Sequence, residues 1–323
     1  MTSAGSPNPP TDPSRPTTPP PAGGAVAGGA PASYPPPGPR GGAGRVAALI
    51  GGIGALVLAA GGALFYADMS NARTERSHQS YDPAGTVQLV SDGDVTVRAA
   101  DGDVEVEAIA HSGLTSPRYS SREEGDELVV THKCSWWPAI FSRCAGELDV
   151  TLPAGTDVVV RTANGEVFAA GIAGTLDAGT SNGRVESSGN TGGQILGTSN
   201  GAIVVRDAGG DVRANTSNGS VEAERIAGSL DSGTSNGRIE AAEVSGDVIA
   251  ETSNGRIDID GFGGDVRAVT SNGSVTVTGD GEPVRLVIDT SNGSRTVEGP
   301  TDPDADRTVE ISTSNGDAAY LSR

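Results

Sequence analysis

The sequence predicts an all-β protein in which 18-residue coils stack into a single-stranded β-helix or solenoid, preceded by one transmembrane α-helix and a disordered proline-rich tail. The chain returns nine times to Thr-Ser-Asn-Gly or Thr-Ala-Asn-Gly, and the first seven returns are 18 residues apart. A fixed period of this kind is typical of one supersecondary unit stacked on itself. Apolar residues alternate with polar ones between the turns, as in strands, and aromatic residues at 3% leave little material for a bulky core. The turn asparagines are Asn164, Asn182, Asn200, Asn218, Asn236, Asn254, Asn272, Asn292 and Asn315.

Two strands are expected in each unit. The second residue after the turn glycine is Val or Ile in all seven equally spaced units, from Val167 to Val275, so this column should face a core. A second apolar column runs from Leu176 to Val266, and a glycine midway through each unit, such as Gly210, predicts a second corner.

An antiparallel β-meander, with a hairpin turn at every Asn-Gly pair, is the alternative fold. Coils of equal length place identical residues on one another, which produces ladders of Thr and Asn along the stack. A long meander would also need closure of a very wide sheet. The constant period therefore favours the solenoid.

Composition divides the chain into five parts. The tail lacks the amide donors and apolar residues that ordering would need. The next 21 residues carry no charge and would span roughly 31 Å as a helix, enough for a bilayer core. A cleaved signal peptide is the alternative for this segment, and Arg40 and Arg45 ahead of it favour a cytoplasmic N-terminus. The five expected parts are the tail at 1–45, the transmembrane helix at 46–66, a polar stalk at 67–85, an N-terminal β part at 86–161 and the solenoid repeats at 162–323.

Charge and motif content exclude several function classes. The tail carries a charge of +2 and the remainder −21, so a phosphate backbone would be repelled and no nucleic-acid partner is expected. All three histidines precede the repeats, and no serine-hydrolase, zinc-protease or phosphate-loop motif is present. The sequence thus predicts no enzyme, no cofactor and no metal site. A polysaccharide-active β-helix, using Asp211, Asp247 or Asp265, is a minor alternative.

Cys134 and Cys144 are the only cysteines, and an extracytoplasmic position predicts a disulfide between them. The loop that they bracket contains Trp136, Trp137 and Phe141. It could cover the open end of the solenoid core as a cap, or contact a ligand or surface through exposed aromatic rings. The sequence leaves both hypotheses open.

The run Leu152-Pro153-Ala154-Gly155-Thr156, followed by Val158, Val160 and the Asn-Gly repeats, resembles the bacterial putative-adhesin family of β-strand repeats, a family of unknown function. The resemblance covers roughly Thr86 to Arg323. It implies a right-handed β-helix related to the toast-rack modules of cell-envelope stress proteins, and it brings no catalytic residues.

These observations predict a single-pass cell-membrane protein whose extracytoplasmic solenoid acts as an adhesin-like binding or scaffold module at a bacterial envelope. An envelope protein or a glycan would be its partner. The alternative is an envelope-stress sensor that signals through the transmembrane helix to a cytoplasmic partner of the tail.

Overall fold

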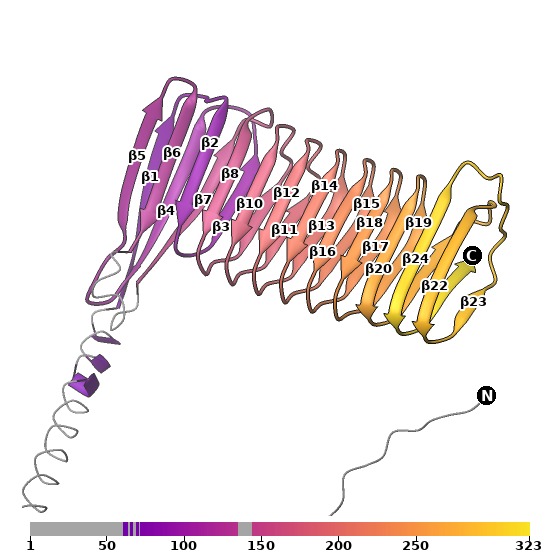
Figure 1. Cartoon of the computed structure of the whole chain (residues 1–323). Helices are drawn as coiled ribbons and strands as arrows, with labels where there is room; N and C mark the ends of the chain where they lie inside the picture. Colours follow the sequence, from indigo (N-terminus) through magenta and orange to yellow (C-terminus); the bar gives the residue numbers. More distant parts are fainter. Residues whose placement is uncertain (1–60, 64, 67–68, 71, 135–143) are drawn as a thin grey trace, which may run out of the picture. The chain divides into compact units, whose positions relative to one another are not determined.

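The computed structural model describes residues 61–63, 65–66, 69–70, 72–134 and 144–323 (Figure 1). The predicted tail at 1–45 and most of the predicted span at 46–66 lie outside these residues. Residues 61–63, 65–66 and 69–70 are helical. Among the described residues, no helix has the length and apolar character needed to cross a membrane.

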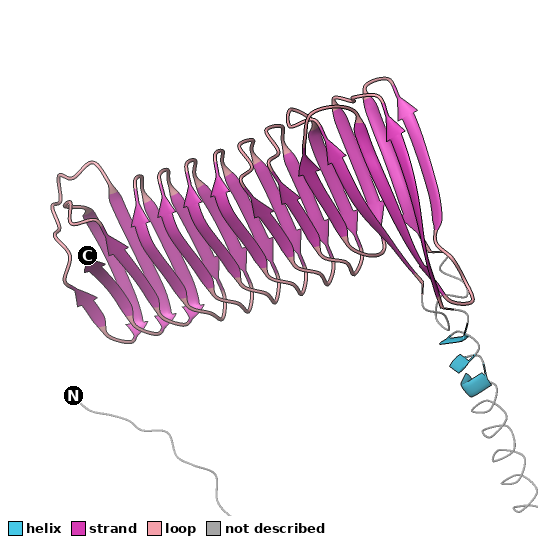
Figure 2. Cartoon of the chain, turned by 180° about the vertical axis from the view of Figure 1, so that it is seen from behind, coloured by secondary structure: helices cyan, strands magenta, loops and turns pink. Residues whose placement is uncertain are grey.

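The strands form two sheets, one of thirteen strands and one of twelve, and through the repeats the chain alternates between them (Figures 1 and 2). The thirteen-stranded sheet has the order β1 (Arg73–Tyr81), β4 (Val104–Ser112), β7 (Ala145–Leu152), β3 (Val95–Ala99), β9 (Val167–Ala170), β11 (Val185–Ser188), β13 (Ile203–Ala208), β15 (Val221–Ile226), β17 (Ile239–Val244), β19 (Ile257–Phe262), β21 (Val275–Gly279), β25 (Ala318–Ser322) and β23 (Arg295–Val297). The twelve-stranded sheet has the order β22 (Arg285–Asn292), β24 (Thr308–Asn315), β20 (Val266–Asn272), β18 (Val248–Thr252), β16 (Leu230–Thr234), β14 (Val212–Thr216), β12 (Gln194–Thr198), β10 (Leu176–Thr180), β8 (Asp157–Thr162), β2 (Thr86–Ser91), β6 (Glu127–Lys133) and β5 (Arg118–Glu124).

Neighbouring repeats run parallel and in register. Val185 pairs with Val167 on one side and with Ile203 on the other, so each residue lies beside its equivalent 18 positions away. The solenoid prediction is therefore confirmed, and the antiparallel meander is wrong for the repeats. Among the described strands, antiparallel pairing is confined to β1 with β4, β4 with β7 and β5 with β6.

The predicted apolar columns form the core between the two sheets. Val167, Ile203 and Val275 are at most 1% exposed, and the column from Leu176 to Val266 is equally buried. Short side chains such as Ala178 and Ala214 stand two residues further along most of these strands, and Leu196 is the exception. The space between the sheets is thus filled mostly by aliphatic side chains, and Phe262 and Tyr320 are also buried there.

Each coil turns at two corners where backbones stack closely. At the Asn-Gly corner, a Cβ on Gly201 would lie well inside 3.0 Å of the Gly183 carbonyl oxygen. At the other corner, midway glycines such as Gly192 make a similar close approach. Three residues before each midway glycine the backbone is left-handed, at Gly171, Gly189, Asp207, Arg225, Glu243 and Gly261.

The order of the coils departs from the order of the chain at both ends. Strands β2 and β3 lie between β6–β7 and β8–β9, although they precede both in sequence (Figure 1). Strands β24 and β25 likewise lie inside β22–β23, although they come last. At each end, the first or last coil of the chain is therefore covered by a coil that is its neighbour in sequence.

The strands of the structure differ from two of the expected boundaries. The segment 67–85, expected to be a polar stalk, contains β1, which pairs with β4 over nine residues. Its side chains are exposed on both faces, so the strand has no apolar alternation by which the sequence could reveal it. The expected boundary at 161/162 falls inside β8, because β2, β3, β6 and β7 are already coils of the same stack.

Candidate functional site

The Asn-Gly corner carries one unbroken ladder of asparagine side chains. Each Nδ2 donates to the Oδ1 of the asparagine in the coil below, at 2.8 to 3.0 Å. All nine predicted turn asparagines take part. The ladder runs from Asn272 to Asn315 and then to Asn292, following the spatial order of the coils.

The turn threonines also bridge the coils, although not to one another as the sequence predicts. Thr198 Oγ1 donates to the Gly183 carbonyl of the previous coil at 3.0 Å. It accepts the Gly201 amide of its own turn at 3.1 Å. The backbone carbonyl lies closer than the next threonine because the glycine corners stack so tightly. Threonine, asparagine and glycine of the motif therefore all serve the fold.

Replacing Asn218 by alanine removes two steps of the ladder, its bonds to Asn200 and Asn236. Each exposed hydrogen bond contributes roughly 0.5 to 1.5 kcal/mol, so we expect the free energy of unfolding to fall by about 1 to 2 kcal/mol. Urea denaturation measures this. Ser217→Ala is the matched control and should leave stability unchanged; an equal loss in both variants would contradict the ladder's role.

The serine of the motif has no comparable task. Ser181, Ser199, Ser217 and Ser235 are exposed. Within the described part of the chain, their hydroxyl groups form no hydrogen bond, although the asparagines beside them are fully engaged. The corner thus presents a row of free hydroxyls, one on each coil.

This row borders a groove on the outer face of the twelve-stranded sheet. Two hollows, of about 560 and 380 Å³, share Asn215 and Thr216 and together run along seven coils, from Arg161 to Val269. The floor of the groove is formed by Gly179, Gly197, Asn215 and Gly233, which occupy one outward-facing column of the sheet. The row Ser181, Ser199, Ser217 and Ser235 forms one wall. We call these eight residues, with the space between them, the outer groove.

The opposite wall mixes apolar and paired charged side chains. Ile195 is 57% exposed, which is unusual for a large aliphatic residue in this chain. Arg213 and Asp231 follow it on the next two coils and pair at 3.2 Å, and Ile249 comes next in the column. A further hollow of about 470 Å³ lies beyond this column, between Ile195 and Ile249.

The outer face of the thirteen-stranded sheet is a network of ion pairs. Arg206 lies within 4.0 Å of Glu186, Glu222 and Glu224. The hydrogen bond from Arg225 lowers the pKa of Asp207, whereas burial raises the pKa of Asp258. Among the described residues, no three His, Cys, Asp or Glu side chains are gathered in a way that could hold a metal ion.

The three acids considered for glycan cleavage hold the second corner together. Asp211 accepts the Ser229 amide at 2.9 Å, Asp247 accepts the Asp265 amide at 2.8 Å, and Asp265 accepts the Thr308 amide at 2.7 Å. Each carboxylate thus binds the backbone of the next coil. This arrangement stacks the acids in one column instead of placing a pair across a substrate.

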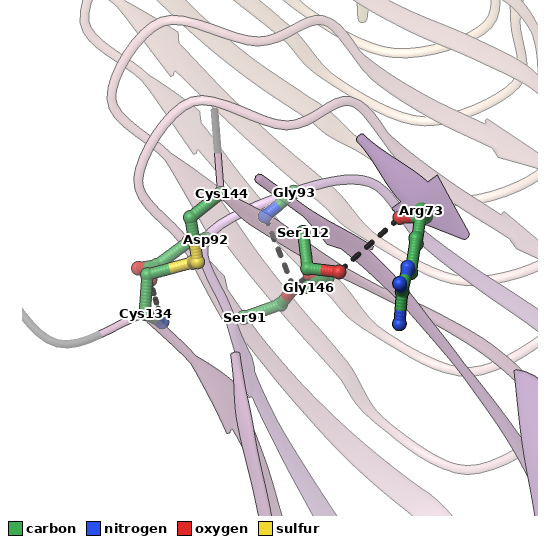
Figure 3. The surroundings of a disulfide bond; sticks show 8 residues. All are labelled: Arg73, Ser91, Asp92, Gly93, Ser112, Cys134, Cys144 and Gly146. Carbon is green, nitrogen blue, oxygen red and sulfur yellow. Dashed lines mark hydrogen bonds between the residues drawn. A yellow bond between two sulfur atoms is a disulfide. The ribbon is translucent and has the colours of Figure 1, made fainter. Parts of the chain in front are cut away.

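The disulfide lies at the Asn-Gly side of the stack, near its N-terminal end (Figure 3). Cys134 and Cys144 are bonded, which confirms that prediction, and their Cα atoms are 6.1 Å apart. They take the place of an Asn-Gly turn between β6 and β7. The Cys134 amide donates to Asp92 Oδ2 at 2.6 Å, which ties the disulfide to the turn of the adjacent coil. Trp136, Trp137 and Phe141 lie outside the described residues.

His132 is 2% exposed and lies at the end of β6, beside this disulfide. Its Nδ1 donates to the Glu147 carbonyl at 3.1 Å, and the Tyr119 ring packs edge-on against it. Burial lowers the pKa of His132, and this effect exceeds the opposite, raising effect of the negative charges on Asp92 and Glu147. The folded state therefore prefers the neutral ring.

A folded pKa below the unfolded value near 6.5 means that stability is complete above that pH and is lost as the pH falls. We expect the free energy of unfolding to decrease between about pH 7 and pH 5. Chemical denaturation at a series of pH values measures it. The slope should flatten in His132→Gln and persist in His78→Gln, since His78 is exposed; the same slope in all three proteins would contradict the assignment.

Comparison with known proteins assigns this architecture to a family. The model of the family Toastrack DUF4097 matches residues 87–320. The chain belongs to the toastrack family. This confirms the resemblance seen in the sequence. No curated protein matches the chain.

The chain is also similar to solved structures that are distant in sequence. A putative adhesin from Bacteroides fragilis is 12% identical, covers 77% of this chain and 97% of its own length, and has a TM-score of 0.45. A putative cell adhesion protein from Clostridium sporogenes is 10% identical, covers 78% and 100%, and has a TM-score of 0.26. A putative lipid binding protein from Parabacteroides distasonis is 12% identical, covers 76% and 96%, and has a TM-score of 0.42.

Sequence reasoning missed the outer groove of this toastrack chain. Its signal was present as Gly179, Gly197 and Gly233, which recur in strands and not at turns. A glycine inside a strand marks a bulge or a close approach by another group. In a chain with 48 glycines, these three did not stand out before the corner glycines were accounted for.

Proposed function

We propose that this protein is a membrane-anchored, extracytoplasmic binding module of the bacterial envelope, adhesin-like in that it offers a rigid stack of strands to a partner. The observation that carries the proposal is that the corners and the ends of the stack have structural roles, whereas the outer faces of the sheets do not. Corner side chains hold the coils together and both ends are closed, so the outer faces of the sheets remain for contact.

The ends of the stack are unsuited to binding. At the N-terminal end, the edge strands β1 and β5 are exposed and rich in charged and hydroxyl side chains. At the other end, the Arg295 guanidinium donates to the Ile288 carbonyl on the free edge of β22. The backbone at Thr301 bridges Val284, which directly precedes this strand. Charged side chains and covering loops are the usual means of blocking edge pairing.

Membrane anchoring is part of the proposal. The uncharged segment 46–66 has the length of a bilayer span, and Phe65 and Tyr66 at its end are 58% and 75% exposed. A disulfide persists in an oxidising compartment, which favours an extracytoplasmic stack. The acidic surface would repel phosphate-rich polymers and leave neutral or cationic partners.

Expression of the full-length chain in bacterial cells tests anchoring and binding together. We expect the protein in the membrane fraction, cleavage of the stack by protease added to cells with a permeable outer layer, and retention of isolated cell-wall material by the purified protein. Recovery from the soluble fraction, or protection of the stack until the inner membrane is lysed, would contradict the proposal.

The same strain separates an adhesin from an envelope-stress sensor. Deleting residues 1–39 removes most of the predicted cytoplasmic tail and leaves the span and stack. A binding module should keep its retention of cell-wall material, whereas a sensor should lose its transcriptional response to envelope damage.

A further inference from the structure

We propose that the outer groove binds a single strand of a linear, uncharged polysaccharide, lying along the stack and crossing the coils. This inference rests on the proposed function and specifies the face and the ligand class.

The floor of the groove contains glycines that the fold does not require. A Cβ on Gly197 would meet no atom nearer than the Asn215 carbonyl oxygen at 4.0 Å, and one on Gly179 would meet Arg161 at 3.7 Å. Neither residue has a left-handed backbone. Glycine inside a strand lowers stability by roughly 0.5 to 1 kcal/mol relative to alanine. The two glycines therefore make the protein less stable than alanine would, and they leave the floor of the groove open.

The corner glycines make the contrast clear. A Cβ on Gly201 or Gly219 would collide with the backbone of the coil below. Those glycines are explained by stacking, whereas Gly179 and Gly197 are explained by something that approaches the sheet from outside. Close approach of a ligand is a recognised use of glycine inside a strand.

The wall of the groove supplies hydrogen-bonding groups of matching chemistry. The hydroxyls of Ser199 and Ser217 have no partner among the described residues and can both donate and accept. The Asn215 side chain stands in the floor column between Gly197 and Gly233 and adds an amide to the groove. Sugar hydroxyls need such mixed donors and acceptors, and the row repeats them once per coil, at about 4.8 Å.

The opposite wall suits the apolar face of a sugar ring. Ile195 is 57% exposed beside the floor at Gly197, so its side chain can cover ring C–H groups. An aliphatic side chain isolated among hydroxyls gains from contact with an apolar surface of similar size. The groove extends across seven coils, about 29 Å, which requires an elongated ligand.

Charge decides which polysaccharides are acceptable. The part of the chain beyond the tail carries −21, and charged groups at the two ends of the groove are paired internally, Arg161 with Asp177 and Arg267 with Glu251. No cationic side chain on the floor is left to hold an acidic polymer. Uronic-acid and phosphate polymers are therefore disfavoured.

The test uses the full-length protein in a detergent that has no sugar headgroup. Calorimetric titration with mannohexaose, cellohexaose and dextran oligosaccharides should show binding of at least one, and polygalacturonate should not bind. Gly197→Tyr places a ring on the floor at a position where the Cβ meets no atom nearer than 4.0 Å, and it should weaken that binding at least about tenfold, or 1.4 kcal/mol. Ala242→Tyr, at an outward position of the other sheet, is the matched control and should bind normally.

Several results would overturn the inference. These are no binding of any neutral glycan, equal binding by wild type and Gly197→Tyr, equal losses in both tyrosine variants with native circular dichroism, or preferred binding of polygalacturonate. A dimer that Gly197→Tyr dissociates would show that a second copy occupies the groove instead.

Failure here and failure of the proposed function can be told apart. If wild-type protein and Gly197→Tyr retain cell-wall material equally, the binding module stands and the groove assignment falls. If the glycan binds in the groove but the protein is recovered in the cytosol, the groove stands and the proposed envelope role falls.

Discussion

Gly219→Ala is expected to lower the free energy of unfolding by at least about 3 kcal/mol, which is among the largest effects of a single added methyl group. The new Cβ would lie well inside 3.0 Å of the Gly201 carbonyl oxygen, in the middle of the stack. That atom is backbone, held by the Thr216 hydroxyl, and cannot move without separating two coils. Urea denaturation of the full-length protein, followed by circular dichroism, measures the loss.

Gly197→Ala is the matched control for this prediction. It adds the same methyl group where the nearest atom, the Asn215 carbonyl oxygen, is 4.0 Å away, so we expect a change within about 1 kcal/mol, in the stabilising direction. Stability of Gly219→Ala within about 0.5 kcal/mol of wild type would mean that the corners do not stack as closely as the structure has them.

The core of the stack was predictable because it repeats. A constant interval from Asn164 to Asn272 requires equal coils, and the Val or Ile after each turn then has to face inward. Parallel pairing followed from the same equality, since only parallel coils place each asparagine on its equivalent. A one-residue change in coil length would have turned every following side chain to the other face.

The order of the end coils could not be predicted, because both candidates carry the same turn. The units around Asn292 and Asn315 differ in their inward residues and not in their motif. Val309 and Ile311 are fully buried in the inner coil, whereas their partners Leu286 and Ile288 in the outer coil are only partly buried. This difference in burial, which depends on the whole end of the stack, decides which coil is covered.

The outer groove was hidden for a related reason. Outward positions do not have to be apolar, so no periodic pattern marks Gly179 and Gly197 as unusual. Only the space around each glycine distinguishes those that the fold needs from those that it does not. The free hydroxyls of the serines likewise became apparent only when threonine and asparagine had been given their partners.

Arg295→Val is expected to convert the protein from a closed stack into one that associates end to end. Arg295 occupies the column of Val275 and Ala318, where every other repeat coil has an apolar residue. From there its guanidinium covers the Ile288 carbonyl on the free edge of β22. An inward-pointing charge on an edge strand prevents pairing with another chain.

Valine at position 295 would complete the apolar column and leave the backbone of β22 free to pair with a second molecule. Val287 and Val297, which are 51% and 44% exposed on this coil, would add apolar surface to the contact. We expect particles of at least about twice the mass of wild type in light scattering coupled to gel filtration, increasing with concentration. Arg256→Val makes the same change on an exposed side chain in the middle of the array, where no edge is available. Association by both variants would indicate non-specific hydrophobic association caused by the added valine. Association by neither would show that the loop at Thr301 closes the end without help from Arg295.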